Sequence, residues 1–108
     1  MNYKVSSIQL FDKQAKRLAK KYPTINSDLA ELFESLETNP NQGTAIGNNF
    51  YKIRFAISAK GKGKSGGAMV ITYLKIVETT EYLSSIYEKG DKDSISTKEL
   101  EQIFKMIP

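Results

Sequence analysis

Two runs of strand-forming residues around a segment of Gly and Lys constrain the fold of this chain most. Residues 50–57 and 68–73 are rich in β-branched and aromatic side chains, and between them the chain reads SAKGKGKSGG. This pattern predicts two strands joined by a loop. The period of two in the first run places its apolar side chains together on one face of a sheet, and these are Tyr51, Ile53, Phe55 and Ile57.

Five basic side chains lie on this first strand or in the loop after it. Lys52 and Arg54 alternate with the apolar residues and should occupy the open face of the sheet, while Lys60, Lys62 and Lys64 follow in the loop. Cations that converge near one sheet edge can hold phosphate groups. Taken alone, the loop lysines also fit a solvated hairpin tip, and the strand cations also fit a face that is merely soluble.

A nucleotide-binding P-loop is excluded, although GKS at 63–65 is similar to the end of that motif. The motif requires Gly five residues before its second Gly, where this chain has Ser58, and it opens a helix. Residues 68–73 read instead as a strand. The Gly-rich segment therefore needs another explanation.

The length and composition favour one domain without a metal or another cofactor. The chain has 108 residues, enough for a single core, so we expect one domain over residues 1–108. It contains no Cys and no His, which removes disulfides, thiolate metal sites and the commonest general base. The acidic residues between 28 and 37 have the spacing of a solvated helix face rather than of a metal site.

The charge distribution predicts an anionic partner. The net charge is +4 and the pI is about 9.2, with basic residues gathered in 13–21 and 52–64 and acidic residues in 28–37. No apolar run approaches the roughly 18 residues of a membrane span, and the first residues lack the apolar core of a signal peptide. We therefore expect no membrane association and a cytoplasmic location.

The sequence before the Gly-rich segment predicts a short strand and two helices. Residues 2–6 fit the strand. Apolar side chains recur at helical spacing over residues 10–22 and again over residues 25–36, and Pro23 separates the two stretches. Two helices with so short a link should form an antiparallel pair.

The sequence after the Gly-rich segment predicts one more strand and a final helix. Residues 82–89 fit the strand, which makes a meander of three, and a capping box of Ser96 and Glu99 precedes an amphipathic C-terminal helix. The expected order is β-αα-βββ-α. It indicates an α+β fold in which the two N-terminal helices pack on one face of a small, mainly antiparallel sheet.

Four segments, taken together and in this order, resemble the RelE/ParE toxin superfamily, and they are most similar to its HigB- and RelE-like members: NP at 39–40, YKIRFA at 51–56, KGKGKSGGAMVI at 60–71 and IYEK at 86–89. The resemblance implies a compact RelE-like fold and a toxin of a type II toxin–antitoxin system. It further implies a ribosome-dependent endoribonuclease that cuts mRNA in the A site without a metal, by attack of a 2′-OH on the adjacent phosphate. The implied partners are a cognate antitoxin protein and the ribosome.

The resemblance also implies the catalytic residues. Arg54 and Lys64 would grip the phosphate, Tyr87 would stack on a base or move a proton, and Lys89 would supply an acid or a supporting charge. Because the chain has no His, the acid and base must come from groups such as Lys and Tyr, whose pKa values a crowd of cations should lower. Taken alone, Tyr87 also fits an ordinary structural aromatic.

The other lysines of this region and one departure from the family pattern complete the expected site. Lys52, Lys60 and Lys62 would bind the RNA backbone. Members of the family usually carry Arg two residues past the Gly pair, where this chain has Met69, and a thioether cannot neutralise the charge of a transferring phosphate. If one preorganised charge is missing, cleavage should be slower by about 10²–10³-fold.

Two alternatives to an active nuclease remain open at this point. One is a ParE-like poison of DNA gyrase without nuclease chemistry, which would not need the loop lysines with Tyr87 and Lys89. The other is a catalytically inactive variant, disarmed by Met69, that still binds its antitoxin. The C-terminal helix has two readings as well: it packs on the sheet, which we expect, or it gives way to an antitoxin helix.

Overall fold

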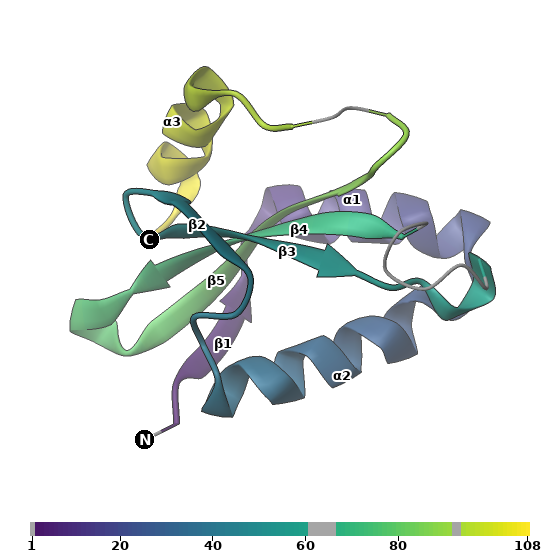
Figure 1. The fold of residues 1–108 in the computed structure, drawn as a ribbon, viewed down its shortest axis with the longest axis horizontal. Helices are drawn as coiled ribbons and strands as arrows, with labels where there is room; N and C mark the ends of the chain where they lie inside the picture. The colour runs from purple at the N-terminus through teal and green to yellow at the C-terminus, as the bar shows by residue number, and fades with distance from the viewer. Residues whose placement is uncertain (1, 61–66, 92–93) are drawn as a thin grey trace.

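The computed structural model describes residues 2–60, 67–91 and 94–108. The elements follow one another as β1 (Lys4–Ser7), α1 (Gln9–Lys21), α2 (Ile25–Thr38), β2 (Thr44–Gly47), β3 (Phe50–Phe55), η1 (Ser58–Lys60), β4 (Ala68–Lys75), η3 (Ile76–Glu78), β5 (Thr80–Glu88) and α3 (Thr97–Met106) (Figure 1). The expected α+β class and order are confirmed, with one strand more than the sequence predicted.

The strands form one mixed sheet in the order β1-β5-β4-β3-β2. β3, β4 and β5 make the expected antiparallel meander, and β1 pairs in parallel with β5. The additional strand, β2, pairs antiparallel with β3 through a two-residue turn at Asn48 and Asn49, both of which have positive φ. Asn tolerates that conformation better than most residues, which makes this pair a suitable hairpin turn.

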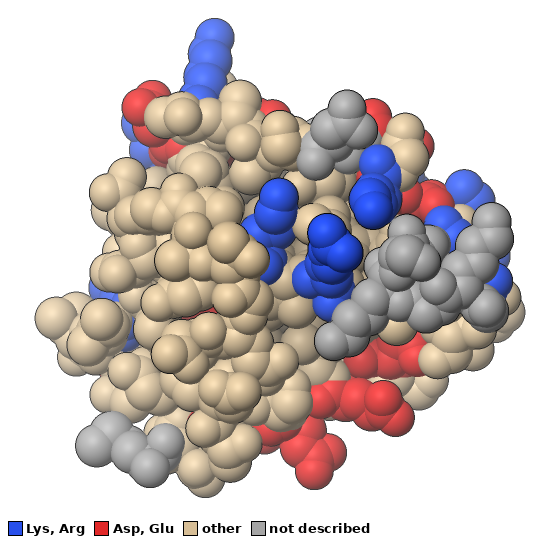
Figure 2. Space-filling model, viewed as in Figure 1, with Lys and Arg blue, Asp and Glu red and all other residues tan. Residues whose placement is uncertain are grey.

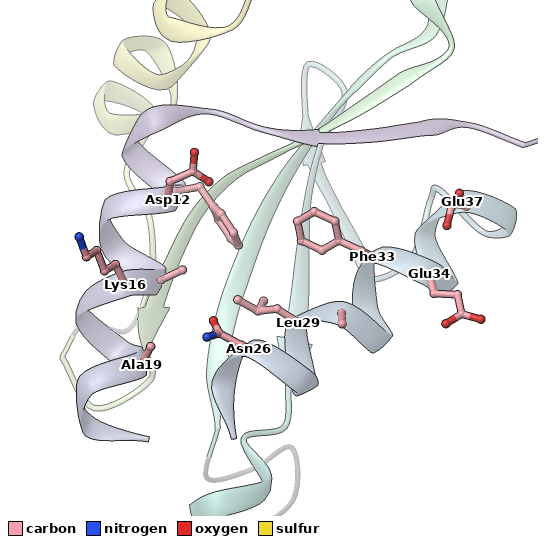
Figure 3. Close-up of a pocket in the computed structure, with 11 residues that line it drawn as sticks. Asp12, Lys16, Ala19, Asn26, Leu29, Phe33, Glu34 and Glu37 are labelled. Carbon is pink, nitrogen blue, oxygen red and sulfur yellow. The ribbon is translucent and has the colours of Figure 1, made fainter. Parts of the chain in front are cut away.

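The two N-terminal helices pack on the same face of the sheet, where they lie side by side in front of its strands (Figure 3). α1 contributes Phe11 and Leu18 to the core and ends at Lys21, shortly before Pro23. α2 contributes its own apolar stripe, and the sheet meets both helices with alternate side chains of β3, β4 and β5; the buried residues of this layer include Leu29, Leu32, Leu36, Ile53, Val70, Leu83 and Ile86.

Among the residues that the structure describes, an acidic side chain lies entirely inside the protein. Glu81 of β5 pairs with Val5 of β1 and Leu74 of β4, and its exposed fraction is 0%. A carboxyl group in such surroundings loses its hydration, so its charged form is disfavoured.

The C-terminal helix packs on the sheet, as expected, and it does so at one end of the face opposite the two N-terminal helices. The ring of Phe50 lies 5.0 Å from that of Tyr73, which lies 5.5 Å from that of Phe104 in α3. The predicted capping box is present, because Ser96 accepts from the backbone N–H of Glu99 and the Glu99 side chain accepts from that of Ser96. α3 covers only part of this face. None of the described helices is long and apolar enough to cross a membrane.

Candidate functional site

Strand register brings three of the singled-out residues into one line. Arg54 of β3 lies opposite Met69 of β4, and Met69 lies opposite Tyr87 of β5. Directly paired residues project from the same face of a sheet. The neighbouring cross-strand trio lies in the core beneath the helices: Ile53, Val70 and Ile86. Arg54, Met69 and Tyr87, which we name the Arg54 row, therefore occupy the face opposite the two N-terminal helices.

The β3 end of the Arg54 row is cationic and open to solvent. Arg54 is exposed, and Lys52, two residues earlier on the same face, is half-buried. Lys and Arg side chains gather over β3 in Figure 2, with acidic side chains over α2 below them. An exposed guanidinium can bind a phosphate through two parallel hydrogen bonds. This end of the row can thus receive an anion.

Tyr87 lies at the other end of the row and is buried, with 7% of its surface exposed. Burial raises the pKa of its hydroxyl, and the negative charge of Glu99, in the first turn of α3, raises this pKa further. The expectation that neighbouring cations would lower such a pKa is therefore wrong for Tyr87. Its hydroxyl stays protonated at neutral pH and can donate a proton but not accept one as a base.

Glu99 is a residue that the sequence did not predict for this site. The sequence marked it only as half of a capping box, and that role is confirmed. Glu99 raises the pKa of Tyr87 only because α3 packs against the sheet near that residue. No local pattern in the sequence predicts this packing. The carboxylate of Glu99 therefore caps the start of α3 and also raises the pKa of Tyr87.

Met69 fills the middle of the Arg54 row and has 6% of its surface exposed. A thioether is a weak hydrogen-bond acceptor and carries no charge. The row therefore has a cation at one end, a hydroxyl at the other, and an apolar side chain between them.

Lys60 lies on the helix side of the sheet, away from the Arg54 row. Its ammonium is 3.4 Å from a carboxylate oxygen of Glu88 and 5.4 Å from the ring centre of Tyr22. Only 22% of its side chain is exposed. The role expected for Lys60, binding of the RNA backbone, stays a prediction, and in this structure its charge is engaged within the protein.

Of the three remaining residues of the predicted site, the structure describes one. Lys89 is exposed and lies one residue beyond β5, so it follows Tyr87 without belonging to the sheet. Lys62 and Lys64 lie outside the described residues. Within the described ranges, no group of three or more acidic side chains is arranged to hold a metal ion.

Two hollows lie away from the Arg54 row. The larger, of about 830 Å³, runs between α1 and α2 (Figure 3), and its lining includes the apolar residues Phe11, Leu29 and Phe33 and the charged residues Asp12, Lys16 and Glu34. The other, of about 610 Å³, lies under α3 and is lined by Phe50, Tyr73 and Phe104. Neither contains a residue of the predicted site.

Comparison with known proteins identifies the fold. No protein-family model matches the sequence. Among solved structures, a variant of the E. coli toxin RelE in the free state aligns with this chain over 100% of both proteins, with a TM-score of 0.63 and 14% sequence identity. This is the RelE fold. The isolated E. coli RelE toxin gives the same result over 97% of this chain and 99% of its own, with a TM-score of 0.52 and 15% identity.

The RelE-like fold that the resemblance implied is thus confirmed. Folds host different activities, so the RelE fold does not by itself say which side chains of this protein act. That question depends on the Arg54 row and its surroundings.

Proposed function

We propose that this protein is the toxin of a toxin–antitoxin pair and that it acts as a metal-independent endoribonuclease on mRNA bound to the ribosome. The observation that carries the proposal is the Arg54 row, an exposed guanidinium and a buried, protonated tyrosine in register on the face of a RelE fold opposite the two N-terminal helices. The proposed partners are a cognate antitoxin and the translating ribosome. The proposed place of action is the cytoplasm.

The chemistry requires few groups. A ribose 2′-oxygen attacks the adjacent phosphorus while the bond from phosphorus to the 5′-oxygen breaks. The 2′-OH loses a proton and the departing 5′-oxygen gains one. The products are a 2′,3′-cyclic phosphate and a free 5′-OH. A protein accelerates this reaction by aligning the reacting atoms, offsetting charge on the phosphorane and transferring protons.

Each end of the Arg54 row has one of these tasks. Arg54 holds the phosphate and offsets its charge, because it is exposed and its planar group matches phosphate geometry. Tyr87 donates the proton to the departing oxygen, because its raised pKa keeps it protonated. Lys52 stands beside Arg54 on the same face and binds the RNA backbone, while Lys64 and Lys89 add charge to the site.

Met69 favours a second candidate, a weakened member of the same class. Its side chain occupies the centre of the row, where a positive charge would lie between Arg54 and Tyr87. A protein of this kind would bind its antitoxin and the ribosome and cleave slowly. It differs from the first candidate only in rate, so the same assay separates the two.

The test is mRNA cleavage on programmed ribosomes, mapped by primer extension. We expect codon-phased cuts from the present sequence, a loss of about 10²–10³-fold in Arg54→Ala and a loss of about 10²–10⁴-fold in Tyr87→Phe. Lys4→Ala is the matched control, since it removes one exposed cation from β1. Uncut mRNA with the present sequence and also with Met69→Arg would refute the proposal, and inhibition of gyrase supercoiling would then favour the gyrase poison.

A further inference from the structure

A carboxylate next to Tyr87 joins three distant parts of the chain. Glu88 follows Tyr87 on β5 and faces the helices instead of the open face. Its Oε1 accepts from Lys21 Nζ at 3.0 Å, and its Oε2 accepts from the Tyr22 hydroxyl at 2.7 Å and from Lys60 Nζ at 3.4 Å. We name Glu88 and these three partners the Glu88 cluster. It links the end of α1, η1 and the end of β5.

The carboxylate at the centre of the Glu88 cluster stays charged at neutral pH. Hydrogen bonding from Tyr22 is the largest influence that lowers the pKa of Glu88, and Lys21 and Lys60 lower this pKa further against the opposing effect of burial. The ammonium groups of Lys21 and Lys60 lie 5.3 Å and 5.4 Å from the ring centre of Tyr22, within the range of a cation–π contact. Lys21 keeps 62% of its side chain exposed, so Lys60 is the more firmly enclosed of the two.

A second set of contacts holds the same short helix, η1, to α2 and to the turn before it. Asp28 of α2 accepts from the backbone N–H of Ser58 at 2.9 Å and from its hydroxyl at 2.6 Å. The hydroxyl of Thr24, in the turn between α1 and α2, accepts from the backbone N–H of Ala59 at 2.9 Å. All three residues of η1 are thus bound to the helical layer or to Glu88, which is a dense attachment for a connecting segment.

We propose that the Glu88 cluster and the Thr24–Asp28 pair form a positioning anchor for the catalytic face. They fix η1, which follows the strand that carries Arg54, against the end of the strand that carries Tyr87. In this reading Glu88 and Lys60 are positioning residues that do not touch RNA. The inference rests on the proposed nuclease function, because it concerns the alignment of the two ends of the Arg54 row.

A competing explanation gives Glu88 the opposite effect. Its carboxylate could stand in for a phosphate and keep Lys21 and Lys60 from RNA, in which case its removal would strengthen RNA binding. The geometry favours the anchor, because Lys60 is enclosed between Glu88 and Tyr22 on the face opposite Arg54. The two explanations predict changes of opposite sign.

The experiment compares Glu88→Gln and Asp28→Asn, which remove one charge each at nearly constant size, with Glu31→Gln, an exposed control on α2. We expect kcat for ribosomal mRNA cleavage to fall by about tenfold or more in both anchor variants while KM changes by less than about twofold. We also expect hydrogen exchange at the amides of Ser58, Ala59 and Lys60 to accelerate by about tenfold or more, with core amides such as Val70 unchanged. Unchanged core exchange separates loss of the anchor from general destabilisation.

A double variant tests whether Lys60 acts through Glu88. Lys60→Met combined with Glu88→Gln should lose little more activity than either change alone, because both remove the same contact. Unchanged kcat with tighter binding of single-stranded RNA would overturn the anchor in favour of competition. Unchanged exchange at η1 would overturn it outright. If the unaltered protein and the Met69→Arg variant both leave mRNA intact, the proposed function fails, and the exchange measurement still decides whether the anchor exists.

Discussion

Raising the pH from about 5 to about 8 should destabilise this protein, because the buried carboxyl group of Glu81 must then ionise within the core. Burial raises the pKa of Glu81 from 4.5 to about 7, an effect that the Thr72 hydroxyl partly offsets. Between these two values the folded protein binds more protons than the unfolded chain. The free energy of unfolding must therefore decrease as the pH rises through this interval.

The size of the effect follows from the two pKa values. The interval from 4.5 to about 7 spans about 2.5 pH units, and each unit corresponds to about 1.4 kcal/mol. The contribution of neutral Glu81 is therefore about 3 kcal/mol, fully present below about pH 4.5 and lost above about pH 7. Total stabilities of small domains are about 5–15 kcal/mol, so such a loss is large enough to measure.

The assay is urea unfolding followed by circular dichroism across this pH range, with Glu81→Gln as the matched variant. The variant should lose most of the pH dependence, because Gln does not ionise. The chain contains no His, so no other side chain type ordinarily titrates near pH 7, and the α-amino group is common to both proteins. Asp28 and Glu88 have lowered pKa values, and their contributions are lost only in more acidic solution. Equal pH dependence in the two proteins, or stability that rises toward pH 8, would refute the reasoning.

Three further substitutions test the site and the fold. Met69→Arg should increase mRNA cleavage by about 10²-fold in the primer-extension assay, because it adds a charge at the centre of the Arg54 row; an unchanged rate would mean that the row needs no third polar group. Leu83→Ala should cost about 2–5 kcal/mol in urea unfolding, since Leu83 is fully buried, and a cost below about 1 kcal/mol would contradict the packing described. Gly43→Ala should lower stability by more than about 1 kcal/mol in the same assay, because Gly43 has a φ of +89° and a Cβ there would lie 2.3 Å from the Lys52 carbonyl oxygen. The control is Ala45→Gly, at an exposed position of β2. Equal stability of the two variants would argue against strain at Gly43.

The sequence predicted the elements whose signals are local. Helical spacing and Pro23 gave the two helices, the Ser96–Glu99 pair gave the start of α3, and alternation placed Arg54 on the open face. β2 was missed because its four residues, TAIG, show no alternation of apolar and polar side chains. The Asn48–Asn49 turn was the available signal, since two residues that tolerate positive φ favour a tight hairpin.

The site was less predictable because its contacts are distant in sequence. Tyr22 and Glu88 are 66 positions apart, and only the folded sheet brings the end of β5 to the end of α1. The pKa of Tyr87 was expected to fall because the sequence places cations around it, whereas burial and Glu99 raise it. Composition indicates which charges are present, but the fold decides which of them a given group encounters.

The parallel pairing of β1 with β5 determines how much of the chain must be synthesised before the sheet can be completed. β1 comprises residues 4–7 and its partner starts at Thr80, so the nascent chain must wait for more than seventy residues before this pair can form. At about 5–20 residues per second, that wait lasts roughly 4–15 seconds. During this time α1 and α2 have no β5 on which to bury their apolar stripes, and Tyr87 has not yet been made. Arg54 and Tyr87 come into register only after β5 has been made, so a nascent chain that stops short of residue 87 carries no assembled Arg54 row.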